Sequence, residues 1–355
     1  MKEYLYSLAT DKSRGLLAGV LKFILFILSL IYGLAIRMLS FFYCLKPYRF
    51  NCRVISVGNI TLGGTGKTLL VEMLAGLLKK DGHRVAVLSR GYKRPGVAHP
   101  VSGESYEAMG DEPYMLSRNL GDIPVIVDKH RARAAKKAIR DYQVDTVILD
   151  DGFQQWKIKK DLEIVTIDAT NPFGNLSMLP RGVLREPLSS LRRADIFVLT
   201  KTNFTKDSQK IKNTLNRISP GCLIFQGGYK PEGFYRLDDS AGTLLGPEAF
   251  AGRQAGLLCG IADPESFAGL IRNLGIGIGI SFKFPDHHQY TKAELDRVAG
   301  ELKKRDIKLL ITTEKDYVRL EACGFRLSAI SCYIMRIRME LTENEAFIKR
   351  IRSLY

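Results

Sequence analysis

Cysteine is scarce in this 355-residue sequence, and the six cysteines present are widely scattered. No two of them form a Cys-x-x-Cys pair. A disulfide framework and a structural zinc site both need closely patterned cysteines, so this spacing argues against both. It favours free, buried thiols in a reducing compartment.

Acidic residues are outnumbered by basic ones. The chain has 37 Asp and Glu against 53 Lys and Arg, a formal net charge of +16. Such an excess points to nucleic acid, an acidic membrane surface or a phosphorylated substrate, without choosing among them. Repeats and low-complexity tracts are lacking, and the 46% hydrophobic content is enough for full cores. The length then predicts two globular units plus an appendage.

The stretch that carries the clearest chemistry is VISVGNITLGGTGKT, residues 54–68. Its apolar start predicts a buried strand, its glycines a loop, and the residues after it a helix whose first amides favour an anion. Thr61 stands where the general pattern has glycine. The segment predicts a nucleoside triphosphate site, and the residues expected to hold the phosphates are Thr61, Leu62, Gly63, Gly64, Thr65, Gly66, Lys67 and Thr68.

A second stretch, VDTVILDD, supports this interpretation. It is an apolar run at residues 144–151 that ends in Asp150 and Asp151. Carboxylates at the end of such a strand can hold the Mg²⁺ that is bound to nucleotide phosphates. A later TKTN places Asn203 where guanine-specific switches have aspartate, which favours adenine nucleotide over guanine.

Residues 16–45 form a long apolar segment with only two charges, Lys22 and Arg37. The uncharged run between them would be about 21 Å long as a helix, against a hydrocarbon core of about 30 Å. That is short for a clean span. Basic residues flank both ends, so the positive-inside rule favours export of neither.

The few polar positions of this segment share one side of the expected helix. At about 100° per residue they fall within one narrow stripe. The pattern favours a helix lying in the cytoplasmic face of a membrane, rather than a single span or a buried core helix. The stripe consists of Lys22, Ser29, Gly33, Arg37 and Ser40.

Beyond the phosphate loop, short apolar runs alternate with helical patterns. This alternation predicts an α/β fold, a P-loop NTPase-type parallel sheet covered on both faces. A second, smaller α/β unit resembling a Rossmann fold follows. The expected division is a membrane-associated segment at 1–50, a P-loop kinase domain at 51–224, a glycine-rich hairpin linker at 225–240 and a C-terminal α/β domain at 241–355.

Three polar clusters compete for roles beside the phosphate loop. In GDEP, Asp111 is as compatible with a helix N-cap as with a catalytic base. In PDHHQY, His287 and His288 are notable in a chain with five histidines, although a surface loop explains them equally well. The third cluster is basic. Its members could bind an anionic substrate or be solvated surface, and they include Arg90, Lys93, Arg94, Arg181 and Arg185.

Seven motifs follow the apolar helix in this order: GNITLGGTGKT, SRGY, GDEP, LDDGFQ, LREP, PDHHQY and TTEKD. This ordered set resembles the tetraacyldisaccharide 4'-kinases of lipid A biosynthesis. The resemblance implies ATP-dependent phosphorylation of the 4'-hydroxyl of a tetraacyldisaccharide 1-phosphate, giving lipid IVA. It also implies that Asp111 and His287 form a catalytic pair across the domain cleft. One departure is Gln155, where the family usually has histidine.

The chemistry of phosphoryl transfer agrees with the resemblance. A sugar hydroxyl needs a nearby base, metal-bridged phosphates and surrounding cations. We expect Thr68, Asp150, Asp151 and Glu112 to supply the Mg²⁺ ligands and Arg90, Arg94 and Arg185 to bind substrate. The expected partners are the lipid disaccharide and anionic lipids of the bacterial inner membrane, not nucleic acid, with the protein a monotopic or peripheral monomer on the cytoplasmic face. Two rival functions are a membrane-bound ATPase scaffold and a kinase of a soluble small molecule.

Overall fold

The computed structural model describes residues 7–91, 99–100, 109–205, 208–238, 243–325 and 330–355. Their twelve strands form one sheet in the order β10-β9-β11-β12-β8-β7-β6-β1-β5-β2-β4-β3. All neighbouring strands are parallel except the pairs β12–β8 and β3–β4. The predicted α/β architecture is confirmed.

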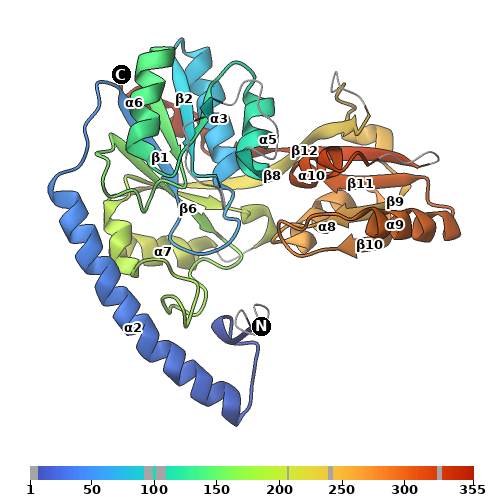
Figure 1. Ribbon diagram of the computed structural model, residues 1–355, viewed down its shortest axis with the longest axis horizontal. Helices are drawn as coiled ribbons and strands as arrows, with labels where there is room; N and C mark the ends of the chain where they lie inside the picture. The colour runs from blue at the N-terminus through green and yellow to red at the C-terminus, as the bar shows by residue number, and fades with distance from the viewer. Residues whose placement is uncertain (1–6, 92–98, 101–108, 206–207, 239–242, 326–329) are drawn as a thin grey trace.

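The first half carries a parallel sheet with helices on both faces (Figure 1). Strands β1, β2, β5 and β7 are buried along almost their whole length, which is why they read as continuous apolar runs. The elements after the N-terminal helix are β1 (Arg53–Gly58), α3 (Lys67–Lys80), β2 (Val85–Ser89), β3 (His99–Pro100), α5 (Asp111–Leu120), β4 (Val125–Val127), α6 (Arg131–Tyr142), β5 (Thr146–Asp150), β6 (Leu162–Asp168), η1 (Leu188–Arg193), β7 (Ile196–Thr200), η2 (Thr202–Phe204) and α7 (Ser208–Ile218).

The second half is smaller and carries the other end of the sheet. Its helices α9 and α10 begin at threonine N-caps, Thr291 and Thr313, whose side chains accept backbone hydrogen bonds from the first turn. The elements are β8 (Leu223–Arg236), η3 (Pro247–Phe250), β9 (Gln254–Cys259), α8 (Pro264–Asn273), β10 (Gly277–Lys283), α9 (Lys292–Lys304), β11 (Leu309–Thr313), α10 (Glu314–Ala322), β12 (Ser331–Leu341) and α11 (Asn344–Arg352).

Two long strands, β8 and β12, join the halves (Figure 1). The stretch 225–240, expected to form a hairpin, lies mostly in the single strand β8, whose antiparallel partner is β12. Residues 223–226 of β8 also pair with β7 in parallel. Turn-forming residues suggested a hairpin, but Pro231 sits opposite Ile337 at a register shift of the ladder, where a missing amide donor is tolerated.

The chain returns to the first half at its end. Phe347 and Ile351 of α11 are fully buried in the same hydrophobic cluster as Leu70 and Leu74 of α3. The core of the first half therefore contains residues from both ends of the folded chain.

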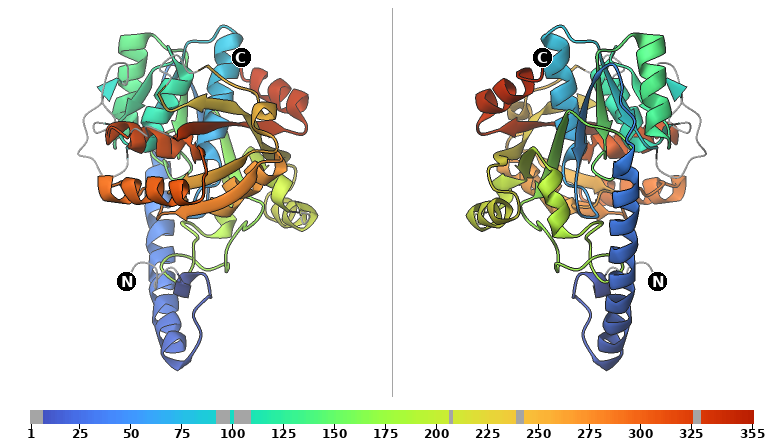
Figure 2. Two further views of the ribbon diagram at one scale, coloured as in Figure 1. Left: turned by 90° about the vertical axis from the view of Figure 1, so that its right-hand side faces the viewer. Right: turned by 90° about the vertical axis from the view of Figure 1, so that its left-hand side faces the viewer.

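The N-terminal helix α2 (Leu16–Leu45) stands away from the body on one side (Figure 1) and projects below it in Figure 2. Part of its polar stripe faces the protein. Lys22 pairs with Asp11 at 2.7 Å, Ser29 is buried, and Gly33 lies against Met178. Most of its large apolar side chains remain exposed, and by length and composition the helix could cross a membrane.

All six cysteines are unpaired, but the expectation of buried thiols holds for only two of them, because Cys52 and Cys222 are partly buried and two others are exposed. Cys259 and Cys332 are buried in the second half, whereas Cys44 and Cys323 are exposed. Cys44 lies in the exposed part of α2 and Cys323 follows the last turn of α10, so neither position has a core around it.

Candidate active site

The phosphate-binding loop connects the buried strand β1 to helix α3. Gly63 and Gly66 have positive φ angles of 113° and 77°, which glycine adopts without strain. A Cβ on Gly66 would lie 2.6 Å from the Tyr229 hydroxyl oxygen, so glycine is also required by space. The carbonyl of Thr65 accepts a hydrogen bond of 3.0 Å from Thr200 of β7. The loop is therefore fixed to the carboxyl end of the sheet.

A cavity of about 470 Å³ lies between this loop and the second half. Four helices have their first turns at this cavity: α3, α5, α8 and α10. The N-terminus of each carries the positive end of the helix dipole. The lining residues at these four helix starts include Lys67, Glu112, Asp263 and Lys315. The convergence makes the cavity suitable for a polyanion.

Asp150 and Asp151 meet the cavity at the end of β5. Burial, together with the negative charges of Glu112 and Asp151, raises the pKa of Asp150 to about 6. Asp150 accepts a hydrogen bond of 3.0 Å from Ser89. Asp150 is a buried carboxylate close to other negative charges, so a bound cation would stabilise its charged form.

Asp151 has a left-handed backbone, with φ at 55°. Its carboxylate lies 3.5 Å from the ammonium of Lys67 and 2.9 Å from the guanidinium of Arg185. Burial would raise the pKa of Asp151, but Lys67 and Arg185 outweigh it and the pKa is lowered. The strained backbone at this position aims the side chain between two cations.

Asp111 and His287 come together from opposite halves. The Asp111 carboxylate and the His287 Nδ1 atom are 3.0 Å apart. Asp111 is 9% exposed, whereas His287 lines the cavity. The hydrogen bond to Asp111 is the main cause of the raised pKa of His287. Residues 176 positions apart thus form one carboxylate–imidazole pair at the edge of the phosphate cavity.

The loop that carries His287 is held in place by buried groups. His287 itself has φ at 60°, in the left-handed region that non-glycine residues rarely adopt. Arg319, only 2% exposed, donates to the carbonyl of His288 at 3.1 Å and lies 3.4 Å from Asp111. Tyr290 donates a hydrogen bond of 2.6 Å to Asp316, which also pairs with Arg319. These contacts fix His287 relative to Asp111.

His288 has a different environment from its neighbour. Its Nε2 atom lies 3.0 Å from Glu294, in the capping box of α9. Its ring stacks on Phe284 at a centroid separation of 4.7 Å. His288 is not among the described residues that line the cavity.

Lys201 ties the halves together on the other side of the cavity. Its ammonium lies 2.6 Å from Asp168 at the end of β6 and 2.8 Å from Asp263, the N-cap of α8. Burial would lower the pKa of Lys201, but the two carboxylates raise it. Lys201 belongs to the TKTN stretch, which was considered only for base recognition, so its structural contact was missed.

The structure brings most of the expected site residues together at one cavity, but a few of them lie elsewhere. Residues 63–68, Glu112, Asp150, Asp151, Arg185 and His287 line the one cavity, with Asp111 behind His287. Thr61 is buried in a bridge with Leu184, and Leu62 is 47% exposed outside the cavity lining. Arg90 is exposed at the end of β2, also outside that lining, and Arg94 lies outside the described residues.

Gln155, the glutamine at the position where the family usually has histidine, is also outside the cavity lining. The hydrogen bonds seen for Gln155 involve only its backbone, in a turn. Its neighbour Gln154 reaches Arg185 at 3.4 Å and Glu186 at 3.1 Å. The polar contact near Asp151 therefore comes from Gln154.

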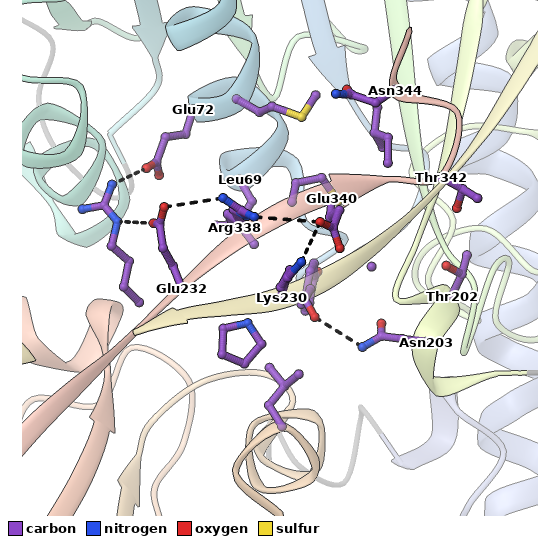
Figure 3. A pocket seen from close by; sticks show the side chains of 18 of the residues that line it. Leu69, Glu72, Thr202, Asn203, Lys230, Glu232, Arg338, Glu340, Thr342 and Asn344 are labelled. Atoms are coloured by element: carbon purple, nitrogen blue, oxygen red, sulfur yellow. Dashed lines mark hydrogen bonds and ion pairs between the residues drawn. The ribbon is translucent and has the colours of Figure 1, made fainter. Parts of the chain in front are cut away.

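A larger cavity of about 1290 Å³ lies beside the β8–β12 ribbon (Figure 3). None of residues 61–68 lines it. Its charged side chains pair across the two strands: Lys230 with Glu340 at 3.0 Å, and Arg338 with Glu232 at 3.8 Å (Figure 3). Size alone therefore does not identify the active site, because the smaller cavity holds the phosphate loop and the Asp111–His287 pair.

An acidic cluster contributes to both cavities, with Glu72 and Glu232 lining the larger one and the buried Glu314 lining the smaller one. Glu72, Glu232 and Glu314 lie around Arg336, and Glu232 is shared with Arg338. Asn119 donates hydrogen bonds to Glu72 and Glu314. Burial, opposed by Arg336 and reinforced by Glu72, raises the pKa of Glu314 to about 8. At neutral pH the cluster holds a proton that the unfolded chain would release.

Glu314→Gln is expected to remove a pH-dependent cost to stability. The pKa of Glu314 is about 8 in the folded protein against an ordinary value of 4.5, so the native state binds the extra proton between these values. The free energy of unfolding therefore falls as pH rises through this window. Near the upper end of that window the variant should be more stable than the parent by about 1–3 kcal/mol, and near the lower end about equal to it.

Urea unfolding at both ends of this pH window measures the effect. Glu345→Gln, at an exposed position of α11, is the matched control and should leave the pH dependence unchanged. If the Glu314 variant and the parent lose stability in parallel as pH rises, Glu314 does not hold the proton.

Comparison with known proteins agrees with the motifs. The family model described as tetraacyldisaccharide-1-P 4'-kinase matches residues 21–355. The tetraacyldisaccharide 4'-kinase of Halothermothrix orenii is 34% identical over 366 residues, covering 96% of this chain and 94% of that protein. The enzyme of the same name from Syntrophobacter fumaroxidans is 39% identical over 308 residues, covering 85% of this chain and 79% of that protein.

A solved structure resembles the whole chain. LpxK from Aquifex aeolicus, crystallised in complex with ATP, superposes with a TM-score of 0.74 at 28% identity, covering 94% of this chain and 99% of that one. The similarity extends across both halves and is not confined to the phosphate-loop sheet.

Proposed function

This chain belongs to the tetraacyldisaccharide 4'-kinase family, and we propose that its phosphoryl transfer takes place between the phosphate-binding loop and the Asp111–His287 pair. The protein is an ATP-dependent kinase of the 4'-hydroxyl of a tetraacyldisaccharide 1-phosphate, a lipid A precursor. Family membership does not favour the rival scaffold ATPase or the kinase of a soluble small molecule.

The contact between Asp111 and His287 is the observation that carries the site assignment. A carboxylate held against an imidazole, at the edge of a cavity that also contains the phosphate loop, is the arrangement needed to take a proton from an acceptor hydroxyl. Asp111 is the proposed base. His287 orients the carboxylate and, with its raised pKa, stabilises the negative charge beside it.

ATP is proposed to bind to residues of the first half. The amides of residues 63–68 and the start of α3 are proposed to hold the β- and γ-phosphates of ATP. Lys67, which lies beside Asp151 and is mostly buried, neutralises the charge that develops as the bridging oxygen leaves. The partners of the loop, Thr166 and Thr200, keep it in place during the transfer.

Oxygen donors for Mg²⁺ lie beside the loop. Thr68, Asp150, Asp151 and Glu112 all line the cavity, and the raised pKa of Asp150 reflects an excess of negative charge there. Among the described residues no three His, Cys, Asp or Glu side chains form a preassembled metal cluster. Mg²⁺ commonly uses one or two carboxylates plus phosphate oxygens, so this donor set fits it. Bound there, the ion would neutralise the charge of the phosphates.

Arg185, which lies between the membrane helix and the cavity, is proposed to bind the substrate's phosphate. Arg185 lines the cavity, and its carbonyl accepts a 3.0 Å hydrogen bond from Tyr32 of α2. A lipid bound beside α2 would therefore have a short path to the transfer site. Arg90 and Arg94 are proposed as further contacts, through the charge they add after β2.

The exposed apolar surface of α2 supports attachment to the cytoplasmic face of the inner membrane, as a monotopic monomer that attracts anionic lipid. Deleting residues 1–45 should move the protein from the membrane fraction to the soluble fraction. ADP affinity should change less than about threefold, because the phosphate loop does not lie on α2. Vesicle flotation and ADP titration measure the two effects. Retention of the shortened protein on vesicles would show that other surfaces anchor it.

The lipid kinase assay tests the function itself. Purified protein is incubated with ATP, Mg²⁺ and tetraacyldisaccharide 1-phosphate, and mass spectrometry follows the addition of one phosphate. A soluble glucosamine disaccharide serves as the alternative acceptor. We expect phosphorylation of the lipid and none of the soluble sugar. ATP hydrolysis with no phosphorylated lipid, or preference for the soluble acceptor, would contradict the proposal.

A further inference from the structure

Lys315 lies across the cavity from the phosphate loop. It is in the first turn of α10, in the second half, and it lines the same cavity as Lys67 and Thr68. Its ammonium forms an ion pair with Glu112 at the start of α5. The cavity thus receives a lysine from each half of the protein.

The local surroundings do not explain a lysine here. The first turn of a helix favours negative side chains, and α10 has Glu314 and Asp316 on either side of Lys315. A charged side chain kept at a position that its own helix disfavours is expected mainly at functional sites.

Lys315 and Arg319 of α10 contact two adjacent acidic residues of α5. Arg319 lies one turn after Lys315 on the same helix, so both side chains point to one side of α10. Arg319 contacts Asp111, and Lys315 contacts the next residue along the chain, Glu112. Lys315 is therefore on the acceptor side of the cavity, whereas Lys67 is on the nucleotide side.

The other cavity cations have carboxylate partners away from the acceptor base. Lys67 and Arg185 share Asp151, and Lys201 is held between Asp168 and Asp263. Among the lysines and arginines that line the cavity in the described residues, Lys315 is the one that pairs with Glu112, the residue next to Asp111.

We propose that Lys315 binds the γ-phosphate of ATP and is a catalytic residue of the transfer. The acceptor oxygen forms a bond to the γ-phosphorus, and the bond from that phosphorus to the bridging oxygen breaks. The acceptor's proton goes to Asp111, and the bridging oxygen leaves on ADP. Lys315 keeps all its protons and stabilises the negative charge on the transferred group, as a cation supplied from a second domain does in other phosphoryl transfers. This inference rests on the proposed function.

Binding of two nucleotides to Lys315→Met tests the contact. The variant removes the charge but keeps most of the length of the side chain. Its affinity for AMP-PNP, which has a γ-phosphate, should fall at least about tenfold, with ADP affinity changed less than about twofold. Its kcat should fall about 10²–10³-fold. Lys315→Arg should recover part of both losses, and Lys308→Met, at an exposed position of the same half, should change neither.

Two outcomes would overturn the proposal. Equal weakening of ADP and AMP-PNP would mean that Lys315 supports the cavity and does not bind the γ-phosphate. In a Glu112→Gln background, Lys315→Met should still weaken AMP-PNP binding to the same extent. If AMP-PNP binding does not weaken further in that background, Lys315 acts only by holding Glu112. Thermal unfolding checks that each variant is folded. The binding assays need no lipid, so their failure is separable from failure of the lipid kinase assay.

Discussion

Lys67→Ala is expected to lower kcat by about 10³-fold while the protein stays folded. Lys67 lies at the start of α3, where its ammonium reaches the phosphate cavity beside Asp151 at 3.5 Å. Its removal deletes a cation from the position where charge develops on the phosphates. Asp151 keeps its contact with Arg185, so the carboxylate is not left without a partner. Initial rates of lipid phosphorylation at saturating ATP measure the loss.

The control for this prediction is Lys79→Ala, at the other end of the same helix. Lys79 pairs with Asp122 on the surface, outside the cavity, and its replacement should leave kcat within about twofold of the parent. Circular dichroism and thermal unfolding establish that both variants are folded. Near-normal turnover in a folded Lys67→Ala protein would refute the assignment of the phosphate loop.

Asp111→Ala is expected to lower kcat by about 10³-fold or more, with little change in ATP affinity. The side chain faces His287 and Arg319 and lies behind the cavity, so its loss removes the proton acceptor without touching the nucleotide site. His287→Ala should lower kcat by about 10²-fold, because the carboxylate remains but is no longer oriented. Steady-state kinetics with lipid and ATP varied separately distinguish kcat from the two KM values.

His288→Ala is the internal control for the pair. His288 faces Glu294 and Phe284, away from Asp111, and its replacement should cost less than His287→Ala. A larger loss at His288 would mean that the neighbouring histidine had been given the wrong role.

Much of the first half could be predicted from the sequence because its signals are local. Strands β2, β4, β5, β6 and β7 coincide with short apolar runs of the sequence, because strands buried on both faces are apolar along their length. The glycines of the phosphate loop also fixed its place between a strand and a helix. Such features need only their own segment to be recognised.

The β8–β12 ribbon could not be predicted in the same way. Its pairing joins Gly227 to Leu341, more than a hundred residues apart, and neither strand carries a local signal for its partner. Helix α10 was missed as well, because its nine residues begin with three charged side chains and show little apolar periodicity. That helix supplies Lys315 and Arg319. TTEKD was noticed only as part of a family resemblance.

The pairing of Asp111 with His287 could be anticipated only through that resemblance. From residues alone, GDEP is as consistent with a helix start as with a base, and the structure places Asp111 at the first position of α5. The N-cap of α5 is Gly110, so the N-cap alternative for Asp111 is wrong, and its role as a base stays a prediction. The start of the helix is what brings the carboxylate to the cavity.

A double-mutant cycle on Asp111 and His287 tests the central claim most directly. It compares kcat for the parent, Asp111→Ala, His287→Ala and the protein with both changes. If the two side chains act as one unit on the acceptor hydroxyl, the double change should cost no more than about twofold beyond the worse single change. Losses that multiply, so that the double variant falls by the product of the two single effects, would show that the residues act independently and would contradict the proposed mechanism.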